Sequence, residues 1–533
     1  MTNVREAVFE LLRARGMTTV FGNPGSTELP FLTEFPDDFR YVLGLQEATV
    51  VGIADGYAQA SGRAALVNLH TAPGVGNAMG AIFNAQANKS PLVITAGQQY
   101  RSLMTLQANL TNRDATRMPH PLVKWSYEPP CAQDVPHAIA RAAHLAALPP
   151  KGPVFVSIPM DDWDVELERP EDVRMQTTRT VAGAGRPDDA VVLELAERLH
   201  AAVSPVFVAG PDVDASGGWD AAIALAERQR LPVYASPAPG GGRIGFPESH
   251  PLFQGTLPPA VGPLGELLAG HDLVLVAGSS VFPYYPNVPG PLLAEGTKLV
   301  AITSDPDEAA RAPMGDALVA DVALTLGALA RAVPESTRDA PAARPAPEAV
   351  ELSTPISPST AVRTLAEVFP EDGIVVLEAP SATLALRNQL RLSRPGSYYF
   401  GAGGGLGFGI SAAIGVQLAQ PDRPVVCVLG EGSAQYAIQS FWSAAAYDVP
   451  VTFLVLRNDE YAILKWFGML EDISGAPGLD LPALDCVAVA SGYGVNSCRV
   501  SAPEELRVQL QRALRSNQPE LIEVQVTPGM ALF

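Results

Sequence analysis

Short runs of consecutive apolar residues, separated by segments long enough for a helix, recur along nearly the whole chain. Short apolar runs without alternation are typical of parallel strands that are covered by helices on both faces. Twelve such runs fall into three groups, at 18–21, 64–69, 92–96 and 153–158, at 206–209, 233–235, 273–276 and 299–302, and at 374–377, 425–429, 451–456 and 521–526. The sequence therefore predicts an α/β protein with three doubly wound parallel-sheet domains.

Two polar segments without a sustained apolar period separate these groups. The first covers 169–188, and the second, rich in Pro, Ala and Glu, covers 334–358. Both are typical of linkers. A chain of 533 residues, 47% of them apolar, can bury several cores. We therefore expect domains over 1–180, 181–340 and 341–533.

Composition and charge exclude several classes of protein. The chain has no apolar run of membrane-spanning length and begins directly in an amphipathic helix, so we expect a cytoplasmic protein without a membrane partner. A net charge of −20 disfavours nucleic acid as a partner, because binding it needs a basic face. With only 17% charged residues, we also expect large subunit contacts. The four cysteines show no CxxC spacing, which fits a reducing compartment: Cys131, Cys427, Cys486 and Cys498.

One strand–turn–helix–strand element has the pattern of a diphosphate and metal site. The strand at 425–429 leads into Gly430-Glu431-Gly432-Ser433, and the strand at 451–456 leads into Asn458. Glycines let backbone amides approach phosphate oxygens, while a carboxylate and an amide oxygen are ligands that a hard divalent cation prefers. This element therefore predicts a bound diphosphate with its divalent metal.

Three motifs in the first group follow strand ends, where open parallel sheets bind ligands. The turn at 21–30 contains Asn23, Pro24 and Ser26, and it is either purely structural or a ligand contact. Glu47 lies in an apolar strand-to-helix junction, where it is a helix cap, an ion-pair partner or a group that shares a proton with a heterocyclic nitrogen. His70 leaves a strand just before a glycine-rich helix start, and its structural and functional interpretations are about equally favoured.

A fourth motif, the glycine run at 403–409, precedes a helix in the third group. Repeated glycines there serve either close helix packing or close approach of the backbone to a ring. The residues alone do not choose between these two roles.

Together with 122–129 and 310–317, these motifs closely resemble the benzoylformate decarboxylases of the thiamine diphosphate-dependent 2-oxo acid decarboxylase family. The resemblance covers nearly the whole chain and is specific over roughly the first 130 residues and again over 396–467. It implies pyrimidine-binding, central and diphosphate-binding domains. It also implies a homotetramer whose active sites lie between the first domain of one subunit and the third domain of another.

The resemblance implies roles for individual residues. Glu47 would hydrogen-bond the aminopyrimidine ring, the Gly404 carbonyl would meet its amino group, and Leu406 would wedge beneath the cofactor. Mg²⁺, or a larger ion such as Ca²⁺, would be bound by Glu431, Asn458 and the Glu460 carbonyl. The other cofactor contacts would come from Asn23, Pro24, Pro380, Ser381, Gly430, Gly432, Ser433, Asn458, Tyr461 and Leu464.

The resemblance also implies a substrate site. Ser26 and His70 would meet the substrate carboxylate and the developing oxyanion, and Tyr285 would complete the catalytic group. An apolar pocket would be lined by Phe400, Leu464 and Phe467, which implies an aromatic or bulky 2-oxo acid. No FAD is expected in the central domain, because the turn at 210–212 has only one glycine.

The chain departs from the family pattern at three positions. Tyr285 stands where the family has a second active-site histidine, and a phenol is a poor proton shuttle at neutral pH. Pro380 replaces a threonine and removes a hydroxyl from the pocket. Glu431 replaces an aspartate: either the turn relaxes around the longer side chain and metal binding persists, or cofactor binding and activity are weakened.

The function implied is the non-oxidative decarboxylation of an aryl 2-oxo acid such as benzoylformate to the aldehyde and CO₂. Two alternatives stay open. Loss of the second histidine would favour a carboligase or lyase that makes or cleaves 2-hydroxyketones, with aldehydes as partners. If Glu431 blocks cofactor binding, the chain would instead be a degenerate thiamine diphosphate-binding regulatory subunit.

Overall fold

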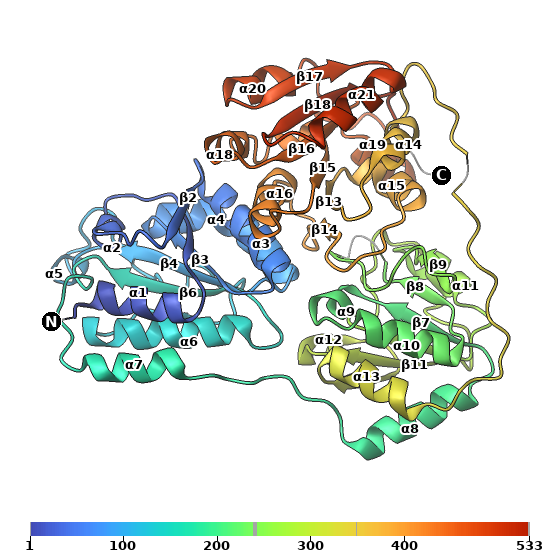
Figure 1. Cartoon of the computed structure of the whole chain (residues 1–533), viewed down its shortest axis with the longest axis horizontal. Coiled ribbons are helices and arrows are strands. Elements are labelled where there is room, and N and C mark those ends of the chain that lie inside the picture. Colours follow the sequence, from blue (N-terminus) through green and yellow to red (C-terminus); the bar gives the residue numbers. More distant parts are fainter. Residues whose placement is uncertain (1, 238–241, 348, 531–533) are drawn as a thin grey trace.

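The computed structural model describes residues 2–237, 242–347 and 349–530. Within them, the strands form three sheets of six parallel strands each, and helices cover both faces of every sheet (Figure 1). This confirms the predicted α/β class and the three parallel-sheet domains. No helix in the described ranges is long and apolar enough to cross a bilayer.

The first sheet has the strand order β2-β1-β3-β4-β6-β5. Neighbouring strand residues point to opposite faces, so Val20 packs with helices α1 (Val4–Ala14) and α6 (Val135–Ala147), whereas Phe21 packs with α3 (Glu47–Ser61) and α4 (Thr71–Ala87). The six strands are β1 (Thr19–Gly22), β2 (Arg40–Leu43), β3 (Ala65–Leu69), β4 (Leu92–Gln98), β5 (Ser126–Tyr127) and β6 (Val154–Pro159).

The central sheet has the strand order β12-β11-β10-β7-β8-β9. Helices α8 (Asp189–Ala201), α10 (Trp219–Gln229) and α13 (Val322–Ala332) cover one face, and α11 (Val261–Leu267) covers the other. The strands are β7 (Pro205–Ala209), β8 (Val233–Ala235), β9 (Phe253–Thr256), β10 (Leu273–Ala277), β11 (Lys298–Thr303) and β12 (Asp316–Val319).

The third sheet has the strand order β14-β13-β15-β16-β18-β17. Its strands β13 and β15 are buried, except for the half-buried last residue of β15. Through helix α16 (Phe408–Ala419), these strands share one continuous apolar core with α3 and α4 of the first domain. The strands are β13 (Ile374–Glu378), β14 (Tyr398–Phe400), β15 (Val425–Gly430), β16 (Val451–Arg457), β17 (Asn496–Val500) and β18 (Glu520–Gln525).

All twelve predicted strands are present, and each sheet has two further strands that we did not predict: β2, β5, β9, β12, β14 and β17. The predicted linker at 169–188 is helical in its first half, where α7 (Pro170–Thr178) lies against α1 and α6 (Figure 1), whereas 179–188 contains no helix or strand. The buried Val173 of α7 supplies the one apolar anchor. The segment 334–357 contains no helix or strand in its described part, in agreement with the predicted linker. The domain limits at 180 and 340 stay predictions.

The first and third domains meet where α3 crosses α16 (Figure 1). A Cβ at Gly56 would lie 2.1 Å from the Ala412 carbonyl oxygen, and a Cβ at Gly415 would lie 1.9 Å from the Ile53 carbonyl oxygen. The two helices therefore touch backbone to backbone, which only glycine permits at these positions. This contact fixes how the two domains are oriented.

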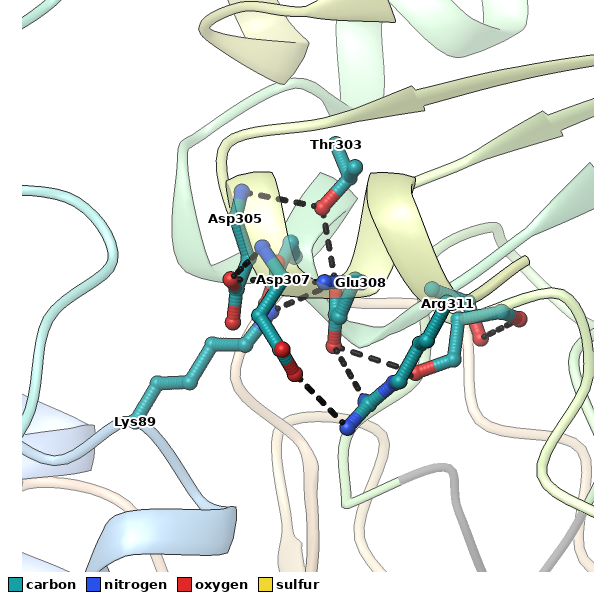
Figure 2. A network of polar contacts seen from close by, with 9 residues as sticks. Lys89, Thr303, Asp305, Asp307, Glu308 and Arg311 are labelled. Atoms are coloured by element: carbon teal, nitrogen blue, oxygen red, sulfur yellow. Dashed lines mark hydrogen bonds and ion pairs between the residues drawn. The ribbon is translucent and has the colours of Figure 1, made fainter. Parts of the chain in front are cut away.

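The first and central domains meet at Lys89, which follows α4 (Figure 2). Its ammonium nitrogen lies 2.7 Å from an oxygen of Asp212 and 3.0 Å from one of Glu308. Glu308 is further bonded to Thr303 and Ser280. Burial disfavours the charged ammonium, but the two carboxylates outweigh it and raise the pKa of Lys89. Lys89, Asp212 and Glu308 therefore connect the two domains through a partly buried charge network.

Candidate active site

Glu47 is the first residue of α3, and its carboxyl group is held by two asparagines. Asn23 Nδ2 donates to Oε1 at 3.2 Å, and Asn77 Nδ2 donates to Oε2 at 3.0 Å. Helix α3 is capped by Gln46, and Glu47 forms no ion pair with any described residue. With Glu47 only 8% exposed, the cap and ion-pair interpretations are excluded, and a carboxyl group with neutral partners remains. Sequence reasoning found Asn23 but missed Asn77.

His70 precedes α4, and its ring is fixed by a buried carboxylate. Nδ1 lies 2.8 Å from Glu28 Oε2 and 3.1 Å from Thr27 Oγ1. Glu28 also accepts hydrogen bonds from the amides of Gly25 and Gly97, so it is itself held rigidly. Because this arrangement uses Nδ1, Nε2 is the nitrogen that can serve a substrate.

The turn at 21–30 therefore has a functional neighbour. A Cβ at Gly25 would lie 2.1 Å from His70 Nδ1, so the ring rests on the turn and requires glycine there. Ser26, the next residue, is exposed beside it. Glu28 and Thr27 were not among the predicted site residues, although both lie inside the motif that was singled out.

The predicted metal ligands converge at the end of the third sheet. Glu431 is 2% exposed and starts α17 (Glu431–Ala434) directly after β15. The backbone amide of Asn458, just after β16, donates to Glu431 Oε1 at 3.2 Å, and Asn458 Oδ1 accepts from the amide of Glu460 at 3.2 Å. Burial raises the pKa of Glu431, and amide hydrogen bonds oppose this only in part.

These residues fit a divalent cation on a diphosphate. A buried carboxylate that is costly to ionise gains from a cation, and the donors are hard oxygens. The described residues contain no cluster of three or more His, Cys, Asp or Glu that could hold a metal. Gly432 lies under the Tyr461 ring, because a Cβ there would be 2.7 Å from it. Ser433 is buried in the same turn.

Four further cofactor positions, Pro380, Ser381, Gly404 and Leu406, lie on the loops after β13 and β14. Pro380 and Ser381 form a 3₁₀ turn after β13, and the segment 401–407 follows β14. Gly404 has φ +73° with open space where a Cβ would be, so its backbone is accessible to a ligand. Gly407 has φ +100° and precedes α16. The glycine run thus serves helix entry at one end and leaves open backbone at the other.

Two residues predicted for the substrate site are brought together from different domains. Tyr285, from the central domain, and Phe467, on α19 (Ala462–Leu470), have ring centroids 4.8 Å apart. Tyr285 is 59% exposed and Leu464, on the same helix, is 46% exposed. Phe400 is half-buried at the end of β14.

Apart from Tyr285 of the central domain, the predicted residues thus form two groups within one chain. Asn23, Glu47 and His70 lie in the first domain, and the diphosphate and metal positions lie in the third. Among the described residues, no hydrogen bond, ion pair or ring contact joins a predicted site residue of one group to one of the other. A cavity of about 480 Å³ between the first and central domains is lined by other residues, including Lys89 and Asp212.

Family models match three successive parts of the chain, one in each of the three sheet domains. The N-terminal binding domain, central domain and C-terminal binding domain of thiamine pyrophosphate enzymes match residues 2–118, 192–329 and 381–524. A benzoylformate decarboxylase of Pseudomonas aeruginosa is 51% identical over 525 residues, which cover 98% of this chain and 99% of the relative. The chain belongs to the benzoylformate decarboxylase family. It is therefore a thiamine diphosphate-dependent carboxy-lyase, as its motifs predicted.

Solved structures of this family have the same fold. The thiamine diphosphate-dependent 4-hydroxybenzoylformate decarboxylase of Rhodococcus jostii RHA1 is 47% identical, with a TM-score of 0.96 and 99% of both chains covered. The benzoylformate decarboxylase of Polynucleobacter necessarius is 40% identical, with a TM-score of 0.96 and 100% of both chains covered. The three domains are thus arranged within this chain as they are in these relatives.

Proposed function

We propose that the chain catalyses the non-oxidative decarboxylation of benzoylformate or a similar aryl 2-oxo acid to the aldehyde and CO₂. The observation that carries this proposal is the Glu47 carboxyl group, which is buried, held by Asn23 and Asn77, and free of any described counter-charge. Such a group, without a counter-charge that would hold it ionised, can exchange a proton with a ring nitrogen. The names of the Pseudomonas and Rhodococcus relatives support an aryl substrate.

Thiamine diphosphate, when bound, supplies the electron sink for the carbanion that is left when CO₂ departs. Glu47 would protonate the aminopyrimidine, and the Gly404 carbonyl would accept a hydrogen bond from its amino group. Glu431, Asn458 and the Glu460 carbonyl would hold Mg²⁺, or Ca²⁺, on the diphosphate, alongside Gly430, Gly432 and Ser433. Asn23, Pro24, Pro380, Ser381, Leu406, Tyr461 and Leu464 would complete the contacts.

His70 and Ser26 would bind the charged end of the substrate. His70 Nε2 can donate to the developing oxyanion, because Glu28 holds the opposite ring nitrogen. Tyr285 can donate a hydrogen bond but transfers protons poorly. The aryl ring would lie against Phe400, Leu464 and Phe467, where exclusion of water strengthens the polar contacts at the other end.

Assay of the purified chain with benzoylformate, thiamine diphosphate and Mg²⁺ tests this proposal. We expect benzaldehyde and CO₂ in equal amounts, and loss of both in the Glu47→Gln variant at unchanged melting temperature. Absence of benzaldehyde from a protein that binds the cofactor would contradict the substrate class.

Added aldehyde separates the carboligase alternative, because hydroxyketone would then exceed free benzaldehyde. Calorimetric titration with cofactor and Mg²⁺ separates the regulatory-subunit alternative, and a visible spectrum without flavin bands would support the expected lack of FAD.

We further propose that each active site forms between two subunits of a cytoplasmic homotetramer. The separation of the two residue groups within one chain supports this. Mixing Glu47→Ala and Glu431→Ala subunits, each inactive alone, tests it. If sites lie between subunits, half of the random pairs are hybrids and each hybrid has one intact site, so about a quarter of the wild-type activity should return. Sites within one chain would return none.

A further inference from the structure

The loop at 401–407 carries two groups proposed to contact the cofactor, the Gly404 carbonyl at the amino group and the Leu406 side chain beneath the cofactor. Five of its seven residues are glycine, and Gly404 and Gly407 have positive φ. Glycine backbones have large conformational freedom, so the loop sequence alone does not define one geometry. Side chains from elsewhere must hold it.

Asn84, on α4 of the first domain, makes a two-point contact with this loop. Its Nδ2 donates to the Gly405 carbonyl at 2.9 Å, and its Oδ1 accepts from the Gly405 amide at 3.1 Å. The side-chain amide therefore satisfies both backbone groups of the residue between Gly404 and Leu406. Asn84 is 4% exposed, and a Cβ at Gly403 would lie 2.7 Å from its Oδ1. The loop is glycine-rich at these positions because it closes directly on Asn84.

Two further side chains, one half-buried and one buried, hold the ends of the loop. Asn88, one turn after Asn84, accepts from the Ala402 amide at 2.9 Å and donates to Asp55 at 2.8 Å. At the other end, Glu378 Oε1 accepts from the amides of Gly407 and Phe408, both at 2.8 Å. Gly404 and Leu406 thus lie between anchored points on both sides.

We propose that Asn84 is a positioning residue for the thiamine diphosphate site, and that Glu378 fixes the same loop from its other end. The proposal rests on the cofactor roles proposed above for Gly404 and Leu406. Neither side chain would touch the reacting atoms. Each would keep the Gly404 carbonyl and the Leu406 side chain at the place where the aminopyrimidine arrives, so that binding does not have to order a free glycine loop.

Helix α4 carries residues that contact both groups of predicted site residues. It is preceded by His70, and Asn77 and Asn84 follow at intervals of seven residues, which places all three on nearly the same face of the helix. Asn77 holds Glu47, and Asn84 holds Gly405. One helix therefore positions parts of both residue groups of the chain.

The test uses four variants and a matched control. Asn84→Ala removes both bonds to Gly405. Asn84→Asp keeps the shape but turns the donor into an oxygen that faces the Gly405 carbonyl. Glu378→Ala removes the acceptor for the amides of Gly407 and Phe408, and Glu378→Gln keeps an oxygen acceptor for them. The control is Gln229→Ala, because Gln229 is also a fully buried helical amide with one donor contact, to Pro334, and one acceptor contact, from Arg338.

Two measurements are made on the full chain. Hydrogen exchange of peptides that cover 401–407, without cofactor, reports loop order, and calorimetric titration with thiamine diphosphate at saturating Mg²⁺ reports affinity. We expect both Asn84 variants and Glu378→Ala to exchange faster in this loop and to bind about tenfold more weakly, which corresponds to about 1.4 kcal/mol. Glu378→Gln should retain most of the affinity. Gln229→Ala should lower the melting temperature without either effect.

The proposal is overturned if the Asn84 variants fold and bind the cofactor as tightly as the wild type. It is also overturned if Gln229→Ala weakens binding equally, because the effect would then reflect general stability. If Asn84→Ala does not fold, Asn84→Asp decides by the same criteria. A wild-type chain that binds no cofactor would refute the proposed function and this role together, whereas normal wild-type binding with unaffected variants would refute only this role.

Discussion

The buried carboxyl group of Glu378 predicts an unusual dependence of stability on pH. Oε1 accepts two amide hydrogen bonds, whereas Oε2 has no partner among the described residues and lies beside Gly409 and Cys427. Burial raises the pKa of Glu378 from its ordinary value of 4.5 to about 8, against the effect of the backbone amides. Between these values the folded chain keeps a proton that the unfolded chain has released. Stability must therefore fall as the pH rises through this range.

The size of this effect follows from the shift. One pKa unit corresponds to about 1.4 kcal/mol, so the free energy of unfolding falls by about that amount for each pH unit. The decrease levels off above the pKa of the folded state. From pH 6 to pH 9 this gives about 3 kcal/mol. In a melting experiment, that is roughly 2–3 °C if the whole chain unfolds together and roughly 7 °C if the third domain unfolds alone.

Substitution of Glu378 by Gln isolates this contribution. Glutamine keeps an oxygen for the two amides and does not titrate, and its unpaired NH₂ adds a cost of about 1–3 kcal/mol that is independent of pH. The melting temperature of the variant relative to the wild type should therefore rise from pH 6 to pH 9. The control is Asp55→Asn, because burial raises the pKa of Asp55 only to about 6. Its difference from the wild type should change below pH 6 and stay level above it. A flat difference for Glu378→Gln would refute the buried, protonated glutamate.

Three further outcomes are expected. Lys89→Met should lower stability by about 3 kcal/mol, because it leaves the half-buried Asp212 without a counter-charge and Glu308 with only Arg311, 3.9 Å away; an unchanged melting temperature would contradict this. Glu431→Gln should weaken thiamine diphosphate binding only when Mg²⁺ is present; a variant that binds as tightly as the wild type in the presence of Mg²⁺ would show that Glu431 is not a ligand. Tyr285→His should raise the ratio of benzaldehyde to hydroxyketone when benzoylformate is supplied with aldehyde, since a histidine transfers protons at neutral pH, and a constant ratio would count against a proton-transfer role at this position.

The sequence predicted those site residues whose signal is local. Glu431 and Asn458 each follow a buried strand, and parallel strands end at the same edge of a sheet, so their proximity could be inferred before the fold was known. The same reasoning placed His70 and the turn at 21–30 together. The partners of these residues were not accessible in this way. Asn77 and Glu28 are identified only by which helix face or loop meets Glu47 and His70 in space.

The six missed strands have a similar explanation. Residues of an edge strand are covered on fewer sides, so most of these strands lack the apolar run that marks a central strand; β14 is aromatic and largely buried but only three residues long. The strand β12 has no fully buried residue, and β17 is polar over three of its five residues, Asn496, Ser497 and Arg499. Helix α7 was missed because a single apolar residue, Val173, packs its short amphipathic turn onto the first domain. In these strands and in α7, contacts with the rest of the domain decide the secondary structure more than the local sequence pattern does.

The rigid packing of the first domain on the third favours an active site shared by two subunits. Asn77 holds Glu47 and Asn84 holds Gly405, at points two helical turns apart on α4. Glu47 and the Gly404 carbonyl are proposed to meet a ring nitrogen and the amino group of one aminopyrimidine. The backbone contact of α3 with α16 leaves little freedom for the two domains of one chain to close around that ring. The Glu47 that serves a given Gly404 should therefore come from a second copy, and the activity recovered on mixing Glu47→Ala with Glu431→Ala measures this directly.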